Sequence, residues 1–293
     1  MISRRLLKNG WSGWHLLSAA VMLLSAVAVT WQGWSQILAL GWTRVMAGHV
    51  FLVPVVAGWL FWVRRKRLLL CRPSGSLPGL VLAGLGAMAF IYGSRRFEPS
   101  LYHLGTVVLP VGCLITMLGR QVLVAYLPGF VVLLALVPPP LAWAEQVAQP
   151  LEIASGLLTT ATYQVLGFSA SLNGLNLRID QTSVRLADVS AGLPMAMSLF
   201  LVSYGFVFGT PLRMSVRLAV LLLSPLSAIL CSGVALIATF WLFRDLPLEV
   251  AEVYLRVSEW VMLMVAFWLL IGGIHALTWA SVPVRRYALA FDQ

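Results

Sequence analysis

The stretch from Leu218 to Phe243 reads LAVLLLSPLSAILCSGVALIATFWLF and contains no charged residue. An α-helix of about 20 apolar residues is long enough to cross a hydrocarbon core about 30 Å thick. Lipid offers no hydrogen-bond partners to an exposed backbone, so a segment that crosses it in this way must be helical. We therefore interpret this stretch as a transmembrane helix, and it sets the fold class expected for the rest of the chain.

Similar apolar runs recur along the sequence. Hydrophobic residues make up 60% of the 293 residues and charged residues only 10%, whereas charged residues are about a quarter of an ordinary soluble domain. The composition predicts an all-α, polytopic membrane helical bundle of about eight transmembrane helices, forming a single domain over residues 1–293. The other predicted spans are Trp14–Trp31, His49–Val63, Leu77–Gly93, Leu101–Gly119, Gln121–Val137, Leu193–Gly209 and Trp260–Ala280.

The first apolar run has two interpretations. It follows a basic start that carries Arg4, Arg5 and Lys8, which also fits a signal peptide with Ala26-Val27-Ala28 as a weak cleavage site. We favour a retained span, because further spans follow and aromatic residues flank both of its ends, as interfacial anchors do.

The distribution of basic residues predicts the orientation of the chain. Most of the 20 Lys and Arg residues fall on the side that holds both termini, including the cluster Arg64-Arg65-Lys66-Arg67. The positive-inside rule places that side in the cytoplasm. All Asp and Glu residues except Asp292 then face outward. The same clustering beside apolar spans excludes a nucleic-acid partner as the reason for the net charge of +10.

The longest interruption between spans is polar and lies on the predicted outer side. Pro138-Pro139-Pro140 ends the fifth span, since proline cannot continue a helix. Leu141–Gly167 is semi-polar, and we expect it to lie along or dip into the interface with a break near Pro150. Next comes NGLNLRIDQTSVRLADVSAGLP, Asn173–Pro194, which fits either a solvated loop or a functional rim at the mouth of the next span.

No motif for a metal, a nucleotide or a hydrolase is present. The three cysteines and four histidines are scattered, so we expect neither a metal nor a cofactor. The residues that could carry chemistry are Ser190 as a nucleophile, Asp188 beside it, and Arg256 as a positive charge at the mouth of the eighth span. The structural alternative is that Ser190 caps a helix and Arg256 anchors one at headgroup level.

Several segments, in this order, resemble the exosortase/archaeosortase family. The resemblance covers nearly the whole chain, from about Gly48 to the eighth span. The segments are GHVFLVPVVAGWLFWVRRKRLLL (Gly48–Leu70), LPGFVVLLALVPPP (Leu127–Pro140), VLGFSASLNGLNLRI (Val165–Ile179), RLADVSAGLPM (Arg185–Met195) and SPLSAILCSGVALI (Ser224–Ile237).

The resemblance implies a multi-pass protein of the bacterial inner membrane with a site on the outer side. Members of this family resemble cysteine transpeptidases. They recognise a C-terminal sorting signal, best known in its PEP-CTERM form, which consists of a short motif, an apolar span and a basic tail. The implied partners are therefore the lipid bilayer and a protein that carries such a signal, often in association with exopolysaccharide export.

The sequence departs from the family at each of the three catalytic positions. Ser190 stands at the Cys position, and Cys231 and Val234 stand where the family has Asn and Arg. Arg256 falls near the His position. A serine hydroxyl needs more help from a base than a thiol does, so the missing base and cation favour a protein that binds sorting signals without cleaving them.

Two alternatives stay open. One is an active sorting peptidase or transpeptidase with a rearranged site of Ser190, Asp188 and Arg256. The other, from a different class, is a small transporter or a structural membrane component. It is weakened because the ionisable residues lie at span ends, whereas a transport path would place some within the spans.

Overall fold

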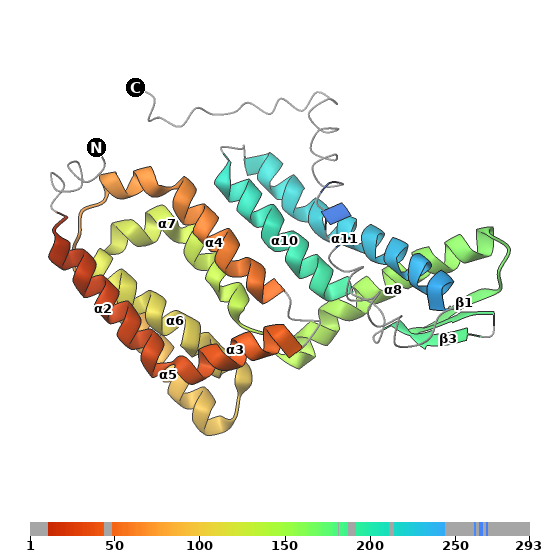
Figure 1. Ribbon diagram of the computed structural model, residues 1–293, viewed down its shortest axis with the longest axis horizontal. Helices are drawn as coiled ribbons and strands as arrows, with labels where there is room; N and C mark the ends of the chain where they lie inside the picture. Colours follow the sequence, from red (N-terminus) through yellow and green to blue (C-terminus); the bar gives the residue numbers. More distant parts are fainter. Residues whose placement is uncertain are drawn as a thin grey trace. The chain divides into compact units, whose positions relative to one another are not determined.

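The computed structural model describes residues 11–43, 49–180, 182–186, 192–210 and 214–243, with residues 261, 264, 265 and 268 beyond them. The chain divides into two compact units, Met1–Pro140 and Leu141–Gln293. Figure 1 labels helices and strands of both units. That residues 1–293 form one functional domain stays a prediction.

The first unit is helical throughout its described secondary structure. Its α-helices are α2 (Gly13–Val29), α3 (Trp31–Thr43), α4 (Leu52–Val63), α5 (Leu77–Arg96), α6 (Pro99–Leu118) and α7 (Arg120–Leu133), and its 3-10 helices are η2 (Arg65–Leu70) and η3 (Leu134–Leu136). The helical part of the fifth predicted span thus ends just before the three prolines, as the sequence indicated.

Helices α5 and α6 form a close antiparallel hairpin. Glycines on both helices have no side chain, so the two backbones can approach each other closely. Gly79, Gly86 and Gly93 recur every seven residues along α5. A Cβ atom added at any of them would lie 2.3 to 2.6 Å from backbone atoms of α6. Gly105 and Gly112 do the same from the α6 side. The hairpin turns at Phe97, which adopts the left-handed conformation with φ of 56°.

The segment after the first predicted span differs from the expectation. No helix was predicted between the spans Trp14–Trp31 and His49–Val63, but residues 31–43 form α3, which is bent by 70° from α2. The break is held by Thr30, whose hydroxyl donates to the carbonyl of Ala26 at 2.8 Å and accepts from Trp34 Nε1 at 3.1 Å. Side-chain hydrogen bonds therefore stabilise a bend that the apolar pattern did not reveal.

The described part of the second unit combines helices with a small sheet. Its elements are α8 (Leu141–Val165), β1 (Ala170–Asn173), β2 (Asn176–Ile179), β3 (Thr182–Arg185), α10 (Gly192–Gly209) and α11 (Met214–Phe243). The strands form an antiparallel sheet in the order β1-β2-β3. The chain is mostly helical, but the all-α prediction was wrong for the polar stretch, which contains β-strands.

Helix α8 runs through Pro150 without a break, so the expected break was wrong. Its later turns pack on α11. Thr159 Oγ1 donates to the carbonyl of Gly233 at 3.3 Å, and Tyr163 Oη donates to that of Ile237 at 2.9 Å. These tertiary contacts stabilise the helix, whereas the proline signal reports only the local loss of one hydrogen bond.

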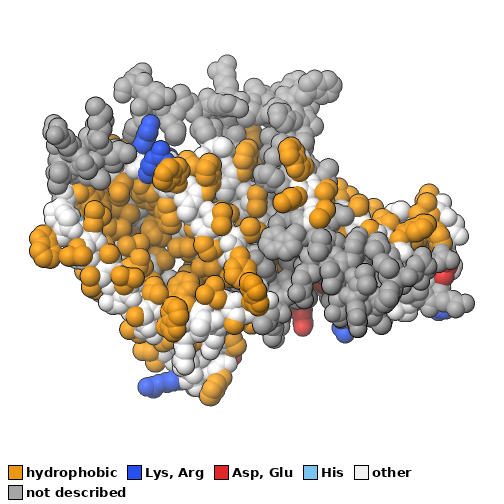
Figure 2. Space-filling view, viewed as in Figure 1, with side chains coloured by type: hydrophobic (Ala, Val, Ile, Leu, Met, Phe, Trp, Pro, Cys, Tyr) orange, Lys and Arg blue, Asp and Glu red, His pale blue; other side chains and the backbone are white. Residues whose placement is uncertain are grey.

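Three helices of the described chain are long and apolar enough to cross a membrane, namely Leu77–Arg96, Pro99–Leu118 and Met214–Ala238. The bent pair α2 and α3 would make a fourth, and His49–Val63, Arg120–Leu136 and Met195–Gly209 are shorter apolar helices. Figure 2 shows hydrophobic side chains over most of the described surface that it draws. The protein is thus a multi-pass membrane protein, while eight spans and cytoplasmic termini remain predictions.

Candidate functional site at the rim of the second unit

The sheet packs through one face against the ends of α8 and α11. Alternate residues of the strands point to this face, since side chains in a strand alternate between its two sides. Leu177 and Leu186 are completely buried there. The buried cluster consists of Tyr163, Ala170, Leu177, Ile179, Leu186 and Leu236. The apolar face therefore fixes the sheet to the helices, and the polar face points away from them.

The sheet lies near the carboxyl end of α11, where the candidate membrane span ends at Ala238. Tyr163 on α8 bonds to the carbonyl of Ile237, and Gln164 Nε2 donates to the carbonyl of Ala170 at 2.9 Å. Trp241 follows and is half exposed, with its ring edge-on to that of Phe168. Tryptophan is enriched at membrane interfaces, which agrees with the predicted position of this polar stretch at the mouth of a span, and that position stays a prediction.

Asp180 organises the turn between β2 and β3. Its backbone is left-handed, with φ of 51°, a conformation that Asp tolerates better than most residues. Its carboxylate accepts hydrogen bonds from the backbone N–H of Ser169 at 3.1 Å and from the hydroxyl of Ser169 at 2.8 Å. One acid thus fastens the β2–β3 turn to the residue just before β1.

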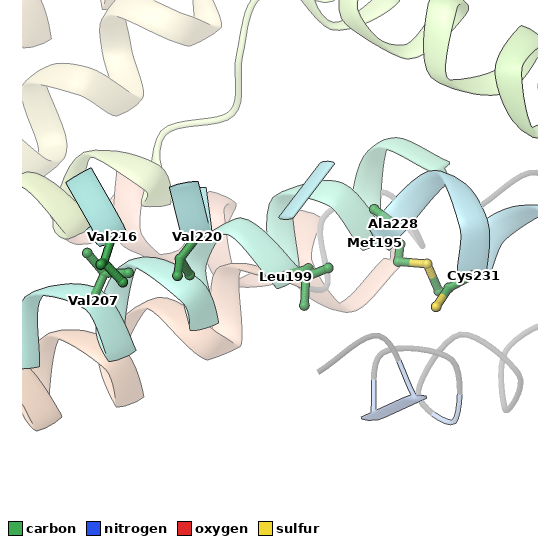
Figure 3. Close-up of a cluster of buried hydrophobic side chains, with 7 residues drawn as sticks. All are labelled: Met195, Leu199, Val207, Val216, Val220, Ala228 and Cys231. Atoms are coloured by element: carbon green, nitrogen blue, oxygen red, sulfur yellow. The ribbon is translucent and has the colours of Figure 1, made fainter. Parts of the chain in front are cut away.

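Beyond the sheet, the amino end of α10 packs against α11. Met195 and Cys231 belong to a buried apolar cluster, and their side chains point toward one another in Figure 3. Cys231 is 2% exposed, whereas Val234 on the same helix is 51% exposed. The position where the resemblance expects Asn therefore holds a buried thiol in apolar surroundings. The position where it expects Arg holds an apolar side chain that faces outward.

The interior of this unit also contains an acid that the sequence analysis had treated as interfacial. Glu152 on α8 is 4% exposed, and Ser155 and Thr159 on the same helix face are fully buried. Both hydroxyls donate to carbonyls of their own helix at 2.8 Å. These three polar side chains of α8 are thus directed into the unit, which the semi-polar sequence did not indicate.

The candidate site residues Ser190, Asp188 and Arg256 lie outside the described residues, and their predicted roles stay predictions. Ser190 stands in the sequence between Leu186, which the sheet fixes, and Gly192, where α10 begins. Within the part of the chain that the structure describes, no group of three His, Cys, Asp or Glu side chains is placed to hold a metal ion.

The sheet is the feature of this rim that the sequence analysis missed. Two signals could have found it. Asn173-Gly174 is a strong hairpin dipeptide, and Leu177 and Ile179 alternate with polar neighbours as a half-buried strand does. In the structure Asn173 pairs with Asn176, so the central residues of the turn are Gly174 and Leu175. Gly174, with φ of 61°, takes the first central position, where a type II′ hairpin turn has glycine.

The described chain is mostly helical, and several of its helices are apolar enough to cross a membrane, which defines its class as a multi-pass membrane protein. A family model for transmembrane exosortases matches residues 41–272, and the chain belongs to that family. The match runs through both units. No curated protein and no solved structure matches the chain.

Proposed function

We propose that the protein is an exosortase-family member of the bacterial inner membrane that binds C-terminal sorting signals of the PEP-CTERM type on the outer side without cleaving them. It would assist protein sorting or polymer-linked export as a binding component. The proposal rests on family membership combined with the substitutions at the positions where the family resemblance expects catalytic groups.

The observation that carries the proposal is the chemical character of Cys231 and Val234, the residues at two of the family's catalytic positions, and the burial of Cys231. Cleavage of a peptide bond needs a nucleophile, a base and a group that stabilises the developing oxyanion. Val234 has no charge to offer, and Cys231 is enclosed by apolar side chains. No histidine occurs between Leu141 and Ile274 in the sequence. Ser190 would have to act without the partners that make a hydroxyl nucleophilic.

The second candidate is an active peptidase or transpeptidase with a rearranged site. Ser190 keeps a hydroxyl at the family's nucleophile position, and Asp188 and Arg256 would then serve as its polar partners. This alternative requires Arg256 to take over the role of the missing cation.

Cleavage in membranes separates the two. The chain is co-expressed with a tagged protein that carries a C-terminal sorting signal from the same genome, beside Ser190→Ala and Ser190→Cys variants. We expect the substrate to co-purify with all three proteins and to remain full-length with the parent and with Ser190→Ala. Trimming by the parent that is lost in Ser190→Ala would establish the active enzyme. If the substrate neither co-purifies nor is trimmed, both candidates fail.

A further inference from the structure

Strand β3 leaves an open edge on the sheet within the described residues. The backbone N–H of Leu186 donates to the carbonyl of Leu175 at 2.7 Å, which makes these two residues a hydrogen-bonded pair. Such pairs alternate along an antiparallel ladder. The backbone groups of Val184 therefore point toward β2, and those of Ser183 and Arg185 point away from it. Ser183 and Arg185 are both exposed, and their outward backbone groups have no partner among the described residues.

The side chains next to this edge are polar and basic. Arg178 lies opposite Ser183 in the register of β2 and β3. Arg185 is two residues beyond Ser183 and is therefore the diagonal neighbour of Arg178, with about 7–8 Å between positions of this kind on adjacent strands. Arg178 Nε donates to the backbone carbonyl of Asp180 at 3.3 Å, and within the described residues neither guanidinium forms an ion pair with a carboxylate. The carboxylate of Asp180 is directed to Ser169 instead. The face is completed by exposed Ser171, Asn173 and Asn176.

An extended peptide would match both the unpaired backbone groups of β3 and the basic side chains beside them. A fourth strand would supply the N–H and C=O groups that the edge of β3 leaves unmatched, and its alternate side chains would lie on the same face as the two arginines. Lipid headgroups could meet the arginine charges, but they carry no regular row of backbone donors and acceptors. A carboxylate on the added strand would form charge-assisted hydrogen bonds with Arg185.

We propose that the edge of β3 binds, by strand addition, an extended acidic segment of the client protein, the segment just ahead of its apolar span. This rests on the proposed function. The sheet lies at the carboxyl end of α11, at the level where a client helix would leave the membrane. The same edge also leads, five residues further along the sequence, to Ser190.

The test measures binding of a fluorescent synthetic peptide to the purified full-length protein in lipid nanodiscs. The peptide is copied from the residues just ahead of the apolar span in a sorting signal of the same genome. We expect Arg185→Gln to weaken binding about tenfold and Arg178→Gln to weaken it less, with Arg72→Gln, an exposed arginine of the first unit, as the matched control. A series of peptides with one N-methylated amide each should lose binding at every second position, because only alternate amides donate to the edge.

Each of the other outcomes of this binding test overturns the proposal and points to a different explanation. If the client co-purifies but neither Arg185→Gln nor N-methylation affects the peptide, strand addition is wrong while the proposed function stands. If Arg185→Gln only promotes self-association, the role of the arginine is to prevent the edge from pairing with another copy of the chain, as charged residues on edge strands do. If neither client nor peptide binds the parent, the proposed function fails as well.

Discussion

At the scale of single residues, Cys71 offers a test of local burial. Its side chain is buried, its carbonyl accepts from Trp11 Nε1 at 2.8 Å, and its thiol donates to the carbonyl of Arg67 at 3.4 Å. Burial raises the pKa of the Cys71 thiol, because the thiolate is disfavoured away from water. The reactive thiolate is therefore scarce at the pH where an ordinary cysteine, with a pKa of about 8.5, begins to ionise.

We expect iodoacetamide to alkylate Cys71 slowly at pH 8 in the folded protein and faster as the pH rises, measured by mass spectrometry with Cys113 and Cys231 replaced by Ala. The raised pKa means that the folded state holds this proton more tightly than the unfolded state. Its contribution to stability is thus complete below the ordinary thiol pKa and is lost as the pH rises through the folded value. Equal rates in folded and denatured protein at pH 8 would contradict the prediction.

Substitution of Asp180 tests how much the β2–β3 turn contributes to stability. Asp180→Ala removes the acceptor for both hydrogen bonds from Ser169 and leaves a residue that tolerates the left-handed conformation less well. We expect a loss of about 1–2 kcal/mol in the free energy of unfolding, seen as a lower midpoint of thermal unfolding in detergent. Asp180→Asn keeps an acceptor and the conformational preference, so it should stay close to the parent. Equal losses in the two variants would show that the charge matters more than the geometry.

At the scale of elements, the sequence predicted the long apolar helices well and the polar segments poorly. The hydrophobic pattern reports which residues avoid water, and α5, α6 and α11 follow from it directly. It does not report which polar groups find partners within the protein. Thr159 and Tyr163 bond to carbonyls of α11, and α8 is one continuous helix through Pro150. The sheet was missed because its Asn-Gly signal was interpreted as part of a loop.

The α5–α6 hairpin can be tested with a pair of glycines two residues apart. A Cβ added at Gly86 would lie 2.6 Å from the backbone nitrogen of Leu109, whereas one added at Gly84 meets nothing within 4 Å. Gly86→Ala should therefore force the helices apart and cost on the order of 1–3 kcal/mol. Gly84→Ala should be neutral or stabilise by up to about 1 kcal/mol, because alanine has the higher helix propensity.

Thermal unfolding of both variants in the same detergent measures this difference. The hairpin interpretation requires that the two midpoints move in opposite directions or that only the Gly86→Ala midpoint falls. A Gly84→Ala protein as unstable as Gly86→Ala would mean that the open face of α5 is itself a close helix contact.

At the scale of the whole molecule, the basic residues predict which side of the membrane the termini occupy. The number of spans then decides on which side each connecting segment lies. The eight-span prediction places Gly75 in the cytoplasm and Ser171 outside, because three predicted spans separate them. The structure raises one alternative. Helix α8 has 25 residues and is therefore about 38 Å long, which is enough to cross a membrane. If α8 crosses, four spans separate the two positions and they lie on the same side.

Cysteine labelling distinguishes the two topologies. Ser171 is exposed, and Gly75 has open space around it, so Ser171→Cys and Gly75→Cys should be tolerated in a background without the three native cysteines. A membrane-impermeant maleimide added to spheroplasts should label Ser171→Cys at once and Gly75→Cys only after the membrane is broken. Labelling of both from outside, or of neither, would mean that an even number of spans separates the two positions, as when α8 also crosses the bilayer and carries Glu152 through it. The sheet would then lie outside only if the first unit were inverted, against the charge of the Arg64–Arg67 cluster.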